Sequence, residues 1–70
     1  MKILLTLIMC SYTEATCIAP YPWPEYQKDF YSCFQKGYEE SLKKIEEIGR
    51  AEVNKHQIYI RFTCEEISTI

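Results

Sequence analysis

Four cysteines in a chain of 70 residues constrain this fold more than any other feature of the sequence. A domain of this size buries only about 60% of the surface of its unfolded chain, so its hydrophobic core alone is marginally stable. Small domains therefore usually add disulfides, a metal ion or a partner. We expect the cysteines to decide how this chain is stabilised, and they stand at Cys10, Cys17, Cys33 and Cys64.

The composition predicts one small globular domain over residues 1–70. Hydrophobic residues make up 47% of the chain and charged residues 26%, which is typical of folded rather than disordered proteins. The formal net charge is −2, so the basic surface of a nucleic-acid binder is missing and no nucleic-acid partner is expected. The apolar runs are much shorter than the roughly 20 residues that span a bilayer, so no transmembrane segment is expected.

The apolar run over residues 3–9 has two interpretations. With Lys2 before it and Ala15 after it, the run resembles a short secretory signal that is cleaved after Ala15. It also has the length and composition of a buried β-strand. Uncleaved, the chain has four cysteines that can all pair, whereas cleavage leaves three. The cysteine count favours the strand, and the cleaved leader stays the alternative.

The middle of the chain predicts a connector followed by a long helix. All three prolines fall within residues 18–24, which indicates an extended segment. Pro24 suits the first turn of a helix, and Asn54 suits its end. Between them, apolar residues recur every three or four positions, and we expect this stripe to face a sheet. The stripe comprises Tyr26, Phe30, Phe34, Tyr38, Leu42, Ile45, Ile48 and Val53.

Residues 57–64 alternate between apolar and polar side chains and predict a second, half-buried strand. The expected order is strand, loop, long helix, strand. A crossover through a helix makes the two strands parallel. The sequence therefore predicts a small α/β fold, in which a two-stranded parallel sheet packs on one helix.

In that parallel topology the four cysteines gather at one end of the fold. Disulfides are the first interpretation, with Cys10–Cys64 and Cys17–Cys33 as the candidate pairs, although the sequence does not choose among the three possible pairings. Buried free thiols in a reducing compartment are the second. A zinc site is the third, but no two cysteines have the close spacing of structural zinc ligands, so no metal or other cofactor is expected.

The sequence offers no catalytic residues. Its only histidine, His56, follows a predicted helix that would extend about 30 Å beyond Cys33, so we expect it to lie far from every cysteine. There is no CxxC, glycine-rich phosphate loop or HExxH motif. We therefore expect a protein that is not an enzyme.

One helix covers only one face of a two-stranded sheet, and the other face would expose either Leu4 and Ile8 or Leu5 and Leu7. Such a face predicts a protein partner or a second copy of the chain. Tyr21 and Trp23 in the proline-rich connector are a further candidate for the interaction surface, although aromatic residues in a loop more often pack on the core.

Three segments together resemble small proteins of marine cyanobacterial tailed phages. They are the apolar start that ends in Cys10–Ser11, the C-x-x-P-x-x-x-P loop from Cys17, and GYEESLKKIEEIGRAEVNKHQIYIRF at residues 37–62. The resemblance implies a source and no activity. It favours a small non-enzymatic interaction or accessory protein of a phage, located in the host cytoplasm or the virion. The alternative is a secreted or periplasmic peptide that is stabilised by disulfides after its signal is cleaved.

Overall fold

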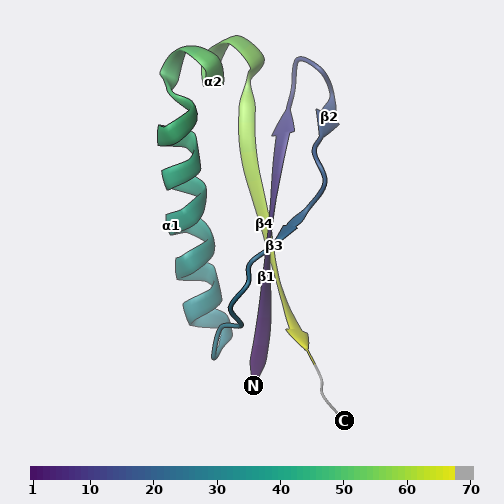
Figure 1. The fold of residues 1–70 in the computed structure, drawn as a ribbon, viewed down its shortest axis with the longest axis vertical. Helices are drawn as coiled ribbons and strands as arrows, with labels where there is room; N and C mark the ends of the chain where they lie inside the picture. The colour runs from purple at the N-terminus through teal and green to yellow at the C-terminus, as the bar shows by residue number, and fades with distance from the viewer. Residues whose placement is uncertain (68–70) are drawn as a thin grey trace.

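The apolar run at the start of the chain forms β1 (Lys2–Ser11), the central strand of a four-stranded antiparallel sheet. In the computed structural model, which describes residues 1–67, two helices accompany this sheet in an α+β fold (Figure 1). The remaining elements are β2 (Thr16–Cys17), β3 (Tyr21–Pro22), α1 (Phe30–Ile48), α2 (Arg50–His56) and β4 (Ile58–Ile67).

The register of the sheet leaves β4 as a complete edge strand. β1 pairs with β4 over ten residues, from Lys2 opposite Ile67 to Ser11 opposite Ile58. On its other side, β1 pairs with the two short strands, with Cys10 opposite Cys17 in β2 and Leu7 opposite Tyr21 in β3. All three pairings are antiparallel, so the predicted two-stranded parallel sheet and the α/β class are wrong.

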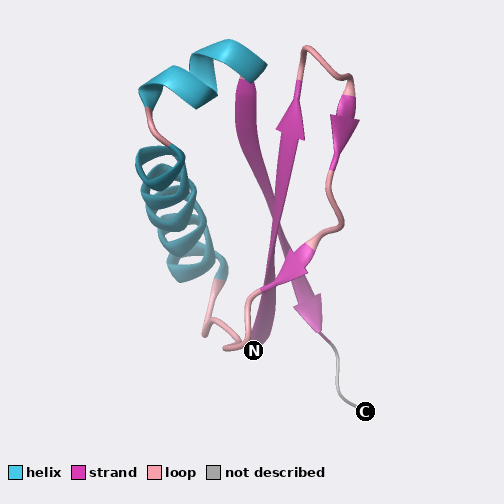
Figure 2. Cartoon of the chain, turned by 45° about the horizontal axis from the view of Figure 1, so that its top comes forward, coloured by secondary structure: helices cyan, strands magenta, loops and turns pink. Residues whose placement is uncertain are grey.

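The path of residues 12–29 explains this difference. After β1 the chain turns at residues 12–15, where Ala15 adopts a left-handed conformation with φ 54°, and then returns beside β1 through β2 and β3. As a result, α1 starts near the beginning of β1 and runs in the same direction, and β4 then returns antiparallel to both (Figure 2). The predicted topology has only a loop in place of this returning segment. The helix then has to carry the chain back to the start of the sheet, which makes the two long strands parallel.

The core lies between α1 and one face of the β1–β4 pair. Ile3, Leu5 and Cys33 are completely buried, and Trp23 and Phe62 pack against them. The apolar run at residues 3–9, which the sequence predicts as either a strand or part of a leader, thus supplies two of these three side chains. Within residues 1–67, no helix has both the length and the apolar composition needed to cross a membrane.

Helix α1 begins six residues later than the sequence predicts. Gln27 and Ile3 exchange two backbone hydrogen bonds of 2.8 and 2.9 Å, which hold the chain extended beyond Pro24. Asp29 is the N-cap, and its carboxylate accepts a 2.8 Å hydrogen bond from the backbone N–H of Ser32. Hydrogen bonds from the backbone and side chain of Ser32 lower the pKa of Asp29, because they favour the charged carboxylate.

Candidate interaction surface

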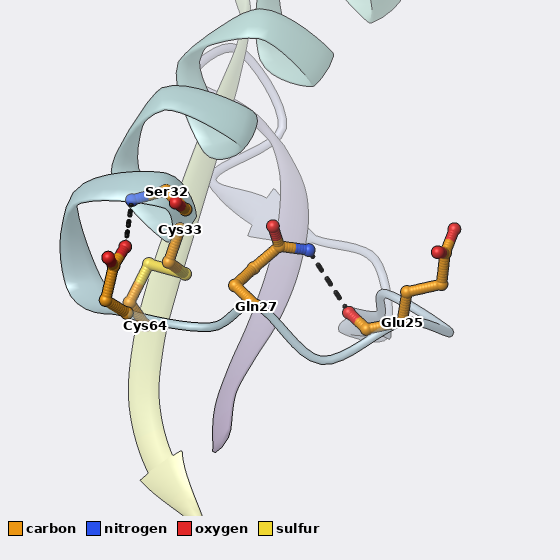
Figure 3. Close-up of a disulfide and its surroundings, with 6 residues drawn as sticks. Glu25, Gln27, Ser32, Cys33 and Cys64 are labelled. Carbon is orange, nitrogen blue, oxygen red and sulfur yellow. Dashed lines mark hydrogen bonds between the residues drawn. A yellow bond between two sulfur atoms is a disulfide. The ribbon is translucent and has the colours of Figure 1, made fainter. Parts of the chain in front are cut away.

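Two disulfides pair all four cysteines, but in neither of the candidate pairs. Cys10 joins Cys17 across the neighbouring strands β1 and β2, and Cys33 joins Cys64, which fastens α1 to β4 (Figure 3). The predicted cluster at one end is also wrong. Because β4 is antiparallel to β1, Cys64 lies opposite Leu5 in the first half of β1, whereas Cys10 lies near the end of that strand.

His56 lies beside the Cys10–Cys17 end of the fold, contrary to the predicted separation from every cysteine. Its backbone carbonyl accepts hydrogen bonds from Ser11 Oγ at 2.6 Å and from Thr13 Oγ1 at 2.9 Å. Its Nε2 lies 3.3 Å from a carboxylate oxygen of Glu52. The antiparallel sheet again explains the difference, because it places the start of β4 next to the end of β1. In the part of the chain that the structure describes, every cysteine is in a disulfide and no three metal-ligating side chains lie together.

Leu4 and Ile8 lie on the sheet face opposite α1, where both are half-buried. This face is not a continuous apolar surface. Thr6 separates the two residues along β1, and Glu65 and Arg61 lie directly opposite them in β4. The predicted apolar patch on the open sheet face is therefore broken by polar and charged neighbours.

Tyr21 and Trp23 lie on the helix side of the sheet, so the structure does not bring them together with Leu4 and Ile8. Trp23 donates a 2.7 Å hydrogen bond from its backbone N–H to Leu5, and its ring packs on the core. Tyr21 meets Trp23 edge-on at 6.2 Å and is 55% exposed. Both line a groove of about 470 Å³ between α1 and the proline-rich segment.

The rotation of α1 about its axis is set by small side chains that face the sheet. Cys33 is fixed to β4 by its disulfide, and Gly37, one turn later, is buried. A Cβ atom on Gly37 would overlap the ring of Phe62, so the helix lies directly on this ring. The face of α1 that carries residues 33 and 37 is therefore the face that packs on the sheet.

This rotation exposes much of the apolar stripe that the sequence predicts to face the sheet. Four residues at intervals of four form a ridge along α1, and their exposed fractions are 38% for Phe30, 48% for Phe34, 69% for Tyr38 and 59% for Leu42. We call these four residues the α1 ridge. Within it, Phe30 and Phe34 stack with ring centroids 6.1 Å apart. Isolated exposed apolar residues are common, but a contiguous row of this kind is typical of an interaction surface.

The α1 ridge runs along the β4 side of the molecule. Tyr38 contacts the Phe62 ring of β4 edge-on, with centroids 4.9 Å apart. The opposite flank of α1 faces the proline-rich segment, where Lys36 Nζ lies 5.3 Å from the centroid of Trp23. The ridge and the outer edge of β4 thus form one continuous part of the surface.

The sequence does contain a signal for this surface. Cys33, Gly37 and Ser41 are also spaced by four and form a row of small side chains beside the apolar stripe. Small residues let a helix approach a sheet closely, so this row marks the packed face, and the bulky stripe next to it is displaced toward solvent. A prediction based on hydrophobicity alone places the apolar stripe against the sheet. For this reason the prediction missed the exposure of the α1 ridge.

Comparison with known proteins identifies no relative of this chain: no family model, no curated protein and no solved structure matches it. The resemblance to phage proteins accordingly stays a prediction. Any function must therefore be inferred from the surface itself.

Proposed function

We propose that this is a small non-enzymatic interaction protein whose α1 ridge binds an apolar protein surface. The observation that carries this proposal is the exposure of Phe34, Tyr38 and Leu42 in one contiguous row on a regular helix. Complete burial of a fully exposed large apolar side chain contributes about 1.5–3 kcal/mol. The ridge residues are only partly exposed, so each contributes a part of that value when a partner covers the row.

The remaining chemistry of the chain supports binding rather than catalysis. The cysteines of the described residues are engaged in disulfides, which removes the thiolate nucleophile that a cysteine enzyme needs. His56 is placed against Glu52 and lies beside a disulfide rather than a reactive thiol. This arrangement offers no pair of nucleophile and base.

We further propose that the protein acts in an oxidising compartment or on a virion. Disulfides form and persist mainly outside the reducing cytoplasm, and both disulfides here link elements that the fold already places side by side. This favours an extracytoplasmic site for an accessory protein of a phage, and it is equally consistent with the alternative of a secreted or periplasmic peptide.

Photocrosslinking tests the proposed function. Benzoylphenylalanine is placed at Phe34 in the ridge and, as a matched control, at the exposed Lys43, on the flank of α1 away from the ridge. After irradiation in the producing cells, we expect a discrete protein adduct from position 34 and none from position 43. Equal or absent labelling at the two positions would contradict a binding role for the ridge.

A further inference from the structure

We infer that the partner of the α1 ridge is a second copy of this chain, and that the β4 edges of the two copies pair antiparallel about a twofold axis at Thr63. This inference rests on the proposed function and deepens it by naming the partner. In the resulting dimer the two sheets join into one, and the two α1 helices lie next to each other on the same face.

The outer edge of β4 has backbone groups available for this pairing. Toward β3 and β2, β1 uses the backbone groups of its odd-numbered residues: Leu5 accepts from Trp23, and Met9 accepts from Ile18. The even-numbered residues of β1 therefore bond to β4, and their partners there are odd-numbered. Because bonding direction alternates along an antiparallel strand, the even-numbered residues of β4 direct their N–H and C=O groups outward. They are Ile58, Ile60, Phe62, Cys64 and Glu66.

This edge lacks several of the features that usually prevent strand pairing, although it carries the exposed charged residues Arg61, Glu65 and Glu66. Natural edge strands are commonly short or carry proline, lysine or a bulge. In contrast, β4 is ten residues long, contains neither proline nor lysine, and pairs with β1 without interruption. An edge of this kind favours the addition of another strand.

The charges on β4 select a second copy as that strand and fix its register. Arg61, Thr63 and Glu65 follow one another on the open face of the sheet, and all three are exposed. A twofold axis at Thr63 places Arg61 of each copy directly opposite Glu65 of the other. These are non-hydrogen-bonded pairs, in which opposed side chains come closest, and opposite charges stabilise such cross-strand pairs.

Neighbouring registers lack this complementarity. An axis at Phe62 places Arg61 opposite Thr63, and an axis at Cys64 places Arg61 opposite Ile67. Both preserve the outward hydrogen bonds, but neither pairs opposite charges. The order of charges along β4 is thus complementary to itself only when Thr63 lies on the axis.

The same axis brings the two α1 ridges into contact. Helix α1 packs on both β1 and β4, so its axis is about two strand spacings, or roughly 10 Å, from that of the second copy. This matches the 8–10 Å separation of packed helices. Two steps of ordinary sheet twist rotate the helices by about −40 to −50°, close to the −50° at which rows of residues spaced by four interdigitate. The α1 ridge is such a row.

The level of the axis also identifies the central ridge residue. Cys33 is bonded to Cys64, and Gly37 packs on Phe62, so the part of α1 level with Thr63 lies between residues 33 and 37. Phe34 is therefore the ridge residue nearest the axis. Leu42 lies about 12 Å farther along the helix, at the end of the contact.

Charge reversal tests the inference on the intact, oxidised protein. In Arg61→Glu, two carboxylates face each other at both symmetric pairs, and in Glu65→Arg two cations do. We expect the wild type to sediment as a dimer and each single variant to dissociate at least tenfold more readily. An equimolar mixture of the two variants should recover the dimer, because positions 61 and 65 of the two different chains then carry opposite charges at both pairs. Arg50→Glu and Glu47→Arg are the matched controls, and both should dimerise as the wild type does.

A wild type that stays monomeric to millimolar concentration, or single variants that dimerise normally, would overturn the inference. So would a mixture that fails to associate although both variants give native near-ultraviolet circular dichroism.

Phe34→Ser should weaken the dimer at least tenfold and Leu42→Ser much less, and the reverse order would exclude the axis at Thr63. If the wild type is monomeric but position 34 crosslinks to a different protein, the inferred partner is wrong and the proposed function stands. If position 34 crosslinks to nothing, the proposed function fails as well.

Discussion

Gly37 shows how one residue sets the position of an entire helix. In an exposed helix, alanine is more favourable than glycine by about 1 kcal/mol. Here a Cβ atom would overlap the Phe62 ring, which is part of the packed core. We expect Gly37→Ala to destabilise the protein by about 1–3 kcal/mol, because α1 must move away from the sheet. Guanidinium unfolding at equilibrium measures this change.

A double-mutant cycle gives the control for Gly37→Ala. Phe62→Leu removes the flat ring that the new methyl group meets, so adding Gly37→Ala to this background should cost clearly less than in the wild type. Equal costs in both backgrounds would show that the ring does not limit the approach of the helix. The exposed Gln35→Ala should change stability little.

Asp29 is expected to make the start of α1 sensitive to acid. Hydrogen bonds from Ser32 lower the pKa of Asp29 in the folded protein, so its charged form stabilises the fold above the usual pKa of about 3.9. This contribution is lost as the pH falls through the lowered value. Asparagine also caps helices but does not titrate. The Tm difference between wild type and Asp29→Asn should therefore shrink below about pH 4, and Asp29→Ala should lower Tm at every pH.

The two disulfides, which join different pairs of elements, are expected to contribute unequally to the free energy of unfolding. Cys33–Cys64 closes 31 residues and joins a helix to a strand, whereas Cys10–Cys17 closes only 7 residues between paired strands. Loop-closure entropy gives about 4 kcal/mol for the longer loop and about 2 kcal/mol for the shorter. Cys33→Ala/Cys64→Ala should therefore lose more unfolding free energy than Cys10→Ala/Cys17→Ala, as measured by guanidinium unfolding. The opposite order would mean that β2 depends on its disulfide more than α1 does.

The sequence predicts the long elements but not how they are connected. Hydrophobic patterns locate β1, the body of α1 and β4, because each pattern is a local property. The reversal at residues 12–15 has no such signal, since it contains no glycine, proline or asparagine and places Ala15 at positive φ. Missing this one turn changes the direction of β4. The pairing of the cysteines then changes with it.

The candidate surface depended on the rotation of one helix, which periodicity alone does not determine. The apolar stripe and the row that contains Cys33 and Gly37 lie next to each other on α1, and either could face the sheet. Close approach to Phe62 and the disulfide to Cys64 decide in favour of the small residues. Both are tertiary interactions, so the row of small residues signals the packed face in the sequence, but the folded chain is needed to choose between the two rows.

For the whole molecule, the decisive question is whether folding requires residues 1–15. These residues include the central strand and the buried side chains of Ile3 and Leu5. Without them, β4 and β3 lose the strand with which they pair, and Cys17 loses its disulfide partner. A chain of residues 16–70 should therefore be unfolded, with an unpaired thiol and a poorly dispersed amide NMR spectrum. A well-dispersed spectrum with Cys33–Cys64 formed would instead favour a cleaved leader, because the mature chain would then possess a fold that does not contain β1.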